Sequence, residues 1–290
     1  MRIQIKIKKI SIVLVITAII CIPIGLAYNN VSLTTNAKFA KQLDLALERS
    51  EKWVQENRAE VLELKNIAML TMLRECNDIK ANPVFGEMVR TFLNEPIRNY
   101  TSCWRKEVDP NLPVNEWNLN HAIEKECIDN KWTLYALAPD IAKITPEQMR
   151  LFEPQCWKKR QLTHQLYALI ILSKNKNNDK ELKNLICHLC SRISRCLVFD
   201  LAVVDIYIQK VLFTLKAEHP EKIRRRWIER ILENQNDDGG WGDKWFIITS
   251  DTRRPTFDRA KAVSNQHATI QAVNMLYLVK YKYPQYFGLK

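Results

Sequence analysis

Residues 235–243 read Gln235-Asn236-Asp237-Asp238-Gly239-Gly240-Trp241-Gly242-Asp243 and hold three of the six glycines of the 290-residue chain. Glycine reaches backbone conformations with positive φ and lets another backbone approach closely, so such a cluster indicates a tight turn. An apolar-periodic helix over Trp227–Leu232 precedes the turn, and a second helix is expected over Ala262–Tyr281. The stretch therefore predicts a corner between two helices, with Gln235, Gly239, Gly240 and Trp241 as its structural residues.

Gln235, Gly239 and Trp241 also match the Q-x3-G-x-W core of the QW repeat, and this part of the chain resembles squalene and oxidosqualene cyclases. Related turns occur in protein prenyltransferase β subunits. The likeness covers about residues 227–281, although Arg230 replaces the usual aromatic residue of the repeat. The resemblance to this terpenoid cyclase and prenyltransferase superfamily implies an α/α toroid, while fold alone does not fix a reaction.

Residues 1–27 have the pattern of a targeting segment. Four basic residues within the first nine are followed by the uncharged apolar run Ile10–Cys21, and Gly25-Leu26-Ala27 offers small residues for cleavage. A cleaved signal peptide and a retained membrane anchor are both compatible with this length. Either predicts that residues 28–290 form a single domain outside the cytoplasm, whether periplasmic, secreted or anchored to the membrane.

The net charge is +12, and subtracting the four basic residues of residues 1–27 leaves +8 for the remainder. This balance favours an anionic partner, and Arg224, Arg225 and Arg226 are candidates for contact with an anionic membrane surface. Glu221 and Glu229 support the alternative of a solvated helix face. No pattern points to a specific nucleic acid.

Seven cysteines follow the targeting segment: Cys76, Cys103, Cys127, Cys156, Cys187, Cys190 and Cys196. In an oxidising compartment some of them are expected to form disulfides. Cys187-His188-Leu189-Cys190 invites a zinc interpretation, but a second ligand pair at the usual spacing is missing, so no metal and no cofactor is predicted.

The body of the chain alternates between amphipathic helices and more apolar ones, which predicts about five helical hairpins. The expected pairs are Lys41–Asn57 with Val61–Cys76, Pro83–Leu93 with Asn120–Leu137, a helix from Thr145 with Leu162–Leu172, Asp179–Arg195 with Leu197–Ala217, and Glu221–Asn234 with Ala262–Tyr281. The predicted fold is all-α, an α/α toroid of about five to six hairpins, with a helical-repeat solenoid as the alternative.

Polar residues in otherwise apolar helices are the candidates for an axial site. Asp205 and His267 are the acid–base candidates, and Asp200, Gln209, Gln271 and Asn274 are candidate ligand-binding residues. Each has a structural alternative, in which a buried polar group is bonded to a neighbouring helix.

The catalytic motifs that the resemblance would bring are missing. The Asp-x-Asp-Asp motif of squalene-type cyclases is absent, and no cysteine follows Cys196 to complete a prenyltransferase zinc site with Asp243 and His267. The sequence therefore favours a non-catalytic toroid that binds a hydrophobic or polymeric ligand, such as a glycan, in an axial cavity. The alternatives are an enzyme acting on terpenoids or polysaccharides through Asp205 and His267, and a secreted effector that binds an anionic partner.

Overall fold

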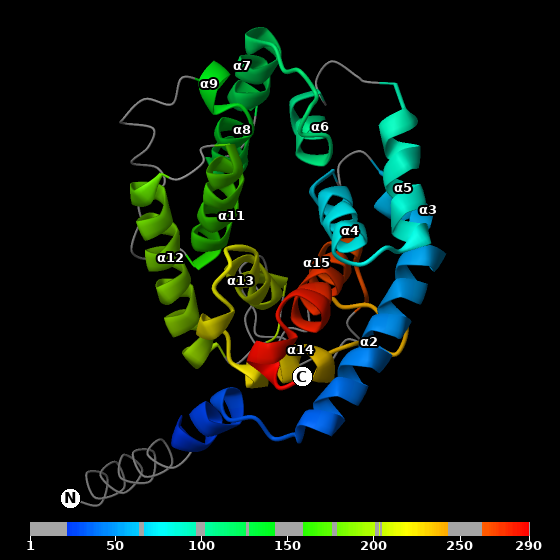
Figure 1. The fold of residues 1–290 in the computed structure, drawn as a ribbon, viewed down its shortest axis with the longest axis vertical. Coiled ribbons are helices and arrows are strands. Elements are labelled where there is room, and N and C mark those ends of the chain that lie inside the picture. The colour runs from blue at the N-terminus through cyan, green and yellow to red at the C-terminus, as the bar shows by residue number, and fades with distance from the viewer. Residues whose placement is uncertain are drawn as a thin grey trace, which may run out of the picture.

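The computed structural model describes residues 22–63, 67–96, 102–125, 128–142, 159–175, 179–200, 203, 205–242 and 263–289. Every regular element within these ranges is helical, which confirms the all-α prediction (Figure 1). No helix in this part of the chain is both long and apolar enough to cross a bilayer. The basic and apolar parts of the expected targeting segment, residues 1–21, lie outside the described ranges.

Residues 22–30 are helical and precede the labelled elements. The α-helices are α2 (Asn36–Glu56), α3 (Arg58–Val61), α4 (Ile67–Ile79), α5 (Pro83–Asn94), α6 (Ser102–Val108), α7 (Glu116–Lys125), α8 (Ile128–Leu137), α9 (Pro139–Ala142), α11 (Lys159–Asn175), α12 (Lys180–Phe199), α13 (Asp205–Lys216), α14 (Arg225–Glu233) and α15 (Gln266–Tyr277). Short turns η3 (Pro220–Lys222), η4 (Leu278–Lys282) and η5 (Pro284–Phe287) complete the described elements.

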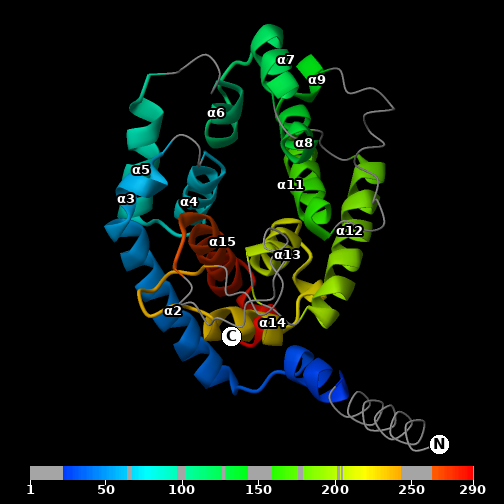
Figure 2. The same cartoon turned by 180° about the vertical axis from the view of Figure 1, so that it is seen from behind.

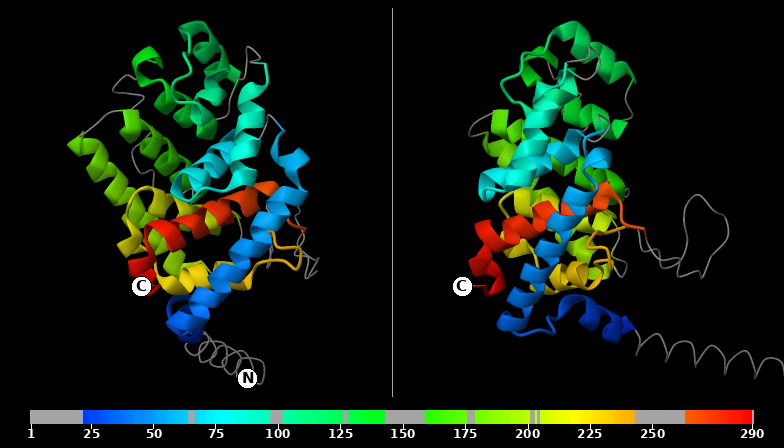
Figure 3. Two further views of the ribbon diagram at one scale, coloured as in Figure 1. Left: turned by 45° about the vertical axis from the view of Figure 1, so that its right-hand side comes forward. Right: turned by 90° about the vertical axis from the view of Figure 1, so that its right-hand side faces the viewer.

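Helices α4, α6, α8, α11, α13 and α15, here called the central helices, follow one another in space in the same order as in the chain. Each contacts the next one, and α15 packs back against α4. Helices α2, α5, α7, α12 and α14, the flanking helices, alternate with them along the chain. Figures 1 and 2 show α2 and α5 on one side of the central helices and α12 on the other. In Figure 3, α2 crosses α15, in agreement with the contact between them.

The burial patterns of the two sets differ as their sequences require. In α2 the buried apolar residues include Phe39, Leu43, Leu47 and Trp53, which recur on one face, so the opposite face meets solvent. In α15 every residue from Ala268 to Tyr277 is buried. A helix that is buried on all sides needs neighbours on all sides, and α4, α13 and α2 supply them.

The predicted helix Asn120–Leu137 is wrong in its start, because α7 begins at Glu116; α7 and α8 cover its described residues, and residues 126 and 127 lie outside the described ranges. The stretch between the two helices of this expected pair contains a further helix, α6. Helix α6 has only seven residues, too few for an apolar period to be recognised. Helix α6 contacts α4 and α8.

The predicted helix Leu197–Ala217 is also wrong. Helix α12 runs on to Phe199 because Leu197 continues its buried face after Leu189 and Ile193. Asp200 then takes an extended conformation, with φ −79° and ψ 105°, and α13 starts at Asp205. The helix expected to begin at Thr145 lies outside the described ranges.

The glycine-rich corner connects α14 to α15 and docks on α2. Gln235 donates from Nε2 to the carbonyls of Ala46, at 2.9 Å, and Gly239, at 2.8 Å. Trp241 is 1% exposed, and its indole Nε1 donates to the Ile231 carbonyl at 2.8 Å. One side chain thus satisfies a carbonyl in the last turn of α14 and fills the space beneath the corner.

Substitution of Gly239 tests this corner. Gly239 has φ +93°, and a Cβ atom would lie 2.4 Å from the Arg49 carbonyl oxygen of α2. We expect Gly239→Ala to lower the free energy of unfolding by about 2 kcal/mol, because the residue is strained and the two backbones must separate. Gly86→Ala is the matched control: its Cβ would meet only the Asn77 side chain, at 3.3 Å. Guanidinium denaturation in which both variants unfold at the same midpoint would contradict this role of Gly239.

The basic run of α14 is not the exposed face that the sequence suggested. The Arg226 side chain is 0% exposed, donates to the Tyr28 carbonyl at 2.8 Å and pairs with Glu233. Arg225 donates to Ser32 at 2.7 Å and to the carbonyl of Thr34. The segment 28–36 covers this helix and engages the two arginines, so among the three candidates only Arg224 remains exposed.

Candidate functional site

A cavity of about 190 Å³, here called the central cavity, lies among the central helices. All six of them contribute to its lining, through Met72 of α4, Glu107 of α6, Thr133 of α8, His164 of α11, Gln209 of α13 and Gln271 of α15, among others. A site that requires side chains from six helices is positioned by the packing of the whole domain.

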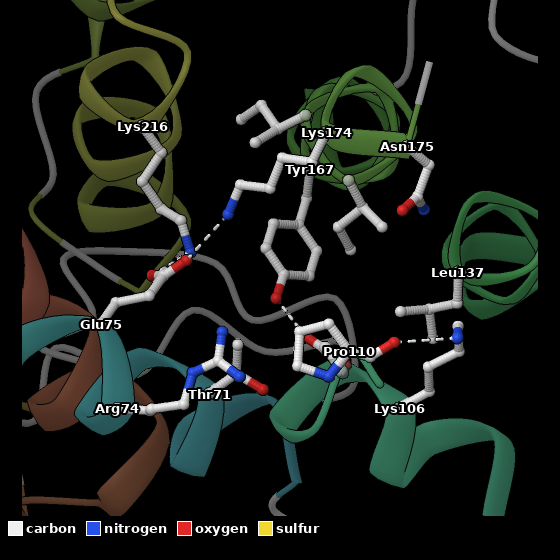
Figure 4. A pocket seen from close by; sticks show the side chains of 13 residues that line it. Thr71, Arg74, Glu75, Lys106, Pro110, Leu137, Tyr167, Lys174, Asn175 and Lys216 are labelled. Carbon is white, nitrogen blue, oxygen red and sulfur yellow. Dashed lines mark hydrogen bonds and ion pairs between the residues drawn. The ribbon is translucent and has the colours of Figure 1, made fainter. Parts of the chain in front are cut away.

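A second cavity of about 200 Å³, here called the basic cavity, is shown in Figure 4. It shares lining residues with the first cavity. It is lined by five of the six central helices, all but α15 among the described lining residues, and mostly by residues that come later in each helix: Gln209 of α13 faces the central cavity, whereas Lys216 faces the basic one. Helices α4 and α11 show the same progression. Glu107 and Tyr167 line both cavities and therefore form the partition between them.

Glu107 is the most unusual ionisable group of this partition. It is 6% exposed, one carboxyl oxygen accepts a hydrogen bond from the Tyr167 hydroxyl, and the other, Oε2, is buried with no hydrogen-bond partner among the described atoms. Burial raises the pKa of Glu107 to about 7, although the Tyr167 hydrogen bond acts in the opposite direction. A carboxyl group in this state can accept a hydrogen bond from a ligand or exchange a proton near neutral pH.

The sequence did not indicate Glu107 because it lies in α6, between the predicted helices Pro83–Leu93 and Asn120–Leu137, where no helix was predicted. Trp104 and Glu107 are three residues apart and both line the central cavity. That spacing places them on one helix face. An aromatic and an acidic residue three positions apart are therefore the sequence pattern that could have identified Glu107 as a site residue.

Three of the predicted site residues do line the central cavity. Gln209 accepts a hydrogen bond from the Thr163 hydroxyl at 3.0 Å. The Gln271 amide nitrogen lies 3.0 Å from a ring nitrogen of His267, and its Oε1 is buried without a hydrogen-bond partner among the described atoms. The structure therefore brings Gln209, Gln271 and His267 together at one site.

Asp205 and His267 meet at the edge of this site. His267 Nδ1 lies 3.6 Å from Asp205 Oδ2, and the two side chains are 49% and 31% exposed, respectively. Asp205 is the first residue of α13, so it does not interrupt an apolar helix as the sequence suggested.

We expect Asp205→Asn and His267→Ala to change the free energy of unfolding by no more than about 0.5 kcal/mol each, because partly exposed polar contacts contribute little. Chemical denaturation of the purified variants measures this. Loss of more than about 2 kcal/mol in both would assign the pair a structural role instead.

Asp200 and Asn274 lie away from the central cavity. The Asp200 carboxylate pairs with Lys210, whose side chain is 1% exposed, where α12 ends. Asn274 is fully buried and donates from Nδ2 to the Met72 carbonyl at 3.1 Å, which fastens α15 to α4. Both residues thus have structural contacts.

Neither disulfides nor a metal cluster is found in the described part of the chain. The expected pairing of cysteines is not formed there: Cys76, Cys187, Cys190 and Cys196 carry free thiols, while Cys127 and Cys156 lie outside the described ranges. Burial raises the pKa of Cys190 to about 12, so its thiol is protonated at neutral pH. No group of three metal-ligating side chains gathers among the described residues.

Comparison of the chain with models of protein families, with curated proteins and with solved structures finds no match.

Proposed function

We propose that the protein is an α/α toroid that binds a ligand in the central cavity. The cyclic order of contacts among the central helices supports the toroid, because each helical pair then adds one segment of a ring. The QW-like corner at Gln235, Gly239 and Trp241 agrees with this architecture. The observation that carries the binding site is the convergence of all six central helices on one partly polar cavity.

The chemistry of the cavity favours a ligand that carries hydroxyl or amino groups. Glu107 Oε2 and Gln271 Oε1 are buried acceptors without hydrogen-bond partners among the described atoms, and a pure hydrocarbon would leave them so. Trp104, Met72 and Phe213 supply an apolar wall against which a ring can pack. These features fit a glycan better than a hydrophobic chain. The cavity is smaller than about 300 Å³, so it holds one ring-sized group of a longer molecule.

Isothermal titration calorimetry with cellotetraose, chitotetraose, maltotetraose and farnesol tests this proposal. We expect at least one tetrasaccharide to bind and farnesol not to bind. Ala68→Phe fills part of the central cavity and should abolish binding, whereas Leu45→Phe, on the exposed side of α2, should leave it unchanged. Binding of farnesol alone, or equal binding by both variants, contradicts the proposal.

A second candidate function is acid–base catalysis on the same ligand. The observation that favours it is the pKa of about 7 for Glu107 beside the Tyr167 hydroxyl, since an acid–base group works best with a pKa near the operating pH. Chromatography of each tetrasaccharide after incubation tests it. Products that form with the wild type and are lost in Glu107→Gln support catalysis, whereas unchanged substrates leave binding as the function.

We also propose export of residues 28–290 by the segment 1–27. Cleavage after Ala27 would retain the contacts of residues 28–36, including the Tyr28 carbonyl with Arg226 and Asn30 with Trp227. N-terminal sequencing of the protein from the extracytoplasmic fraction decides between a mature chain starting at Tyr28 and a retained anchor. Recovery in the cytoplasmic fraction alone contradicts export.

A further inference from the structure

The basic cavity has a lining of unusual charge. Arg74 of α4, Lys106 of α6, Lys174 of α11 and Lys216 of α13 all face it, and so do the carboxyl groups of Glu75 and Glu107. Figure 4 shows the ammonium groups of Lys174 and Lys216 next to the single carboxylate of Glu75. Four cationic side chains from four different helices thus meet at one cavity. Such a cluster of like charges is not needed to stabilise the fold.

The carboxylates do not balance these cations. Glu75 is shared between Lys216, at 2.6 Å, and Lys174, at 3.3 Å. Burial alone would raise the pKa of Glu75, but the two ammonium groups lower it below its usual value, so this carboxyl group is ionised. Even with Glu107 ionised, two carboxylates face four cations.

The remaining two cations meet mostly neutral partners. Lys106 donates to the carbonyls of Pro110, at 3.0 Å, and Leu112, at 3.1 Å. Arg74 donates to the Val108 carbonyl, and its Nε lies 3.8 Å from Asp78, whose side chain is 62% exposed. If Asp78 is counted as well, the described side chains carry an excess of one positive charge, and protonation of Glu107 raises it to two. Such an excess in a partly enclosed space attracts an anion.

Most of the remaining lining is apolar, with Leu137, Ile170, Ile171, Pro110 and the ring of Tyr167. The two polar exceptions, Thr71 and Asn175, donate to the backbone carbonyls of Ile67 and Ala136. An inorganic anion is strongly hydrated and gains no free energy from contact with this apolar surface. An anion that carries an apolar group gains free energy there, because the group is removed from water.

We propose that the basic cavity binds a small organic anion, a carboxylate joined to a short apolar body. The carboxylate lies against Lys174 and Arg74, on the same side of Tyr167 in Figure 4, and the apolar body lies against Ile170, Ile171 and Leu137. This site is separate from the ligand site of the central cavity, although Glu107 and Tyr167 belong to the walls of both.

The test is an NMR titration of protein labelled with ¹³C at the isoleucine δ-methyl groups, with hexanoate, hexanol and inorganic phosphate as probes. Hexanoate should cause saturable shifts at the Ile170 and Ile171 methyl groups and none at Ile228, which is buried in α14. Hexanol lacks the charge and phosphate lacks the apolar body, so each should bind at least about tenfold more weakly.

Lys174→Gln and Arg74→Gln should each weaken hexanoate binding by about tenfold, because each removes a charged donor to the carboxylate. Lys52→Gln, at a 75% exposed side chain of α2, is the matched control and should not change it. The proposal is overturned if hexanoate shifts neither methyl group, if phosphate binds as tightly, or if the three variants behave alike. Ala68→Phe, which fills part of the central cavity, should still bind hexanoate. The proposal for the central cavity and the proposal for the basic cavity can therefore fail independently.

Discussion

Trp241→Ala is expected to lower the free energy of unfolding by about 3–5 kcal/mol, the range for removal of a fully buried tryptophan side chain. Trp241 is 1% exposed, and its indole Nε1 donates to Ile231 of α14 while its backbone N–H donates to Thr269 of α15. Removal of the indole leaves a void and deprives the Ile231 carbonyl of the donor 2.8 Å away. Because the corner also contacts α2 through Gln235 and Ala46, the loss affects three helices at once.

Guanidinium denaturation at neutral pH measures this loss, with Trp117→Ala as the matched control. Trp117 is 67% exposed and, among the described rings, stacks on His121 with centroids 5.2 Å apart. Its replacement should change the free energy of unfolding by no more than about 0.5 kcal/mol. If the two variants lose the same free energy, the glycine-rich corner does not organise the fold.

Glu107→Gln is expected to stabilise the protein at pH 8 by up to about 3 kcal/mol. The pKa of Glu107 rises from 4.5 to about 7 on folding because burial disfavours the charged carboxylate. The folded protein therefore holds a proton that the unfolded chain releases, and wild-type stability falls as the pH rises from about 4.5 to about 7. Glutamine stays neutral and can accept the Tyr167 hydrogen bond through its amide oxygen.

The pH profile separates this effect from a general change in packing. At pH 4 both proteins carry a neutral side chain at position 107, so their free energies of unfolding should be nearly equal. Glu75→Gln is a control for which the expected change in the free energy of unfolding has the opposite sign. The Glu75 carboxylate pairs with Lys216 and Lys174, so its loss should destabilise the protein at pH 8. A constant difference between wild type and Glu107→Gln from pH 4 to pH 8 would contradict the raised pKa.

A residue that costs stability at neutral pH suggests a function for that residue, since natural proteins accept such costs mainly at functional sites. For this reason the Glu107 result bears on the site as well as on the fold.

The sequence predicted the all-α class because amphipathic and apolar segments alternate along the chain. It was less successful where local pattern is weak. Helix α6 is too short for a visible period, and the end of α12 was assigned to the following helix because Leu197-Val198-Phe199 is apolar throughout. Element boundaries depend on capping and on tertiary packing, which periodicity does not contain.

Polar residues in apolar helices predicted part of the candidate site. Gln209, Gln271 and His267 line the central cavity, whereas Asp200 and Asn274 bind neighbouring helix ends and backbone. The sequence could not separate the two groups, because a polar side chain on a buried helix serves either purpose. Arg226 was misplaced because its burial depends on residues 28–36, which are nearly 200 positions away, as in the Arg226–Tyr28 bond with a separation of 198.

The central claim is that the central helices enclose a ligand site, and methionine methyl NMR tests it most directly. Met69 and Met72 line the central cavity, while Met88 and Met275 are buried elsewhere. In protein labelled with ¹³C at the methionine methyl groups, titration with the three tetrasaccharides should shift the Met69 and Met72 signals with at least one sugar and leave Met88 and Met275 unchanged. If no sugar shifts the Met69 and Met72 signals, or if all four signals move together, the central cavity is not the ligand site.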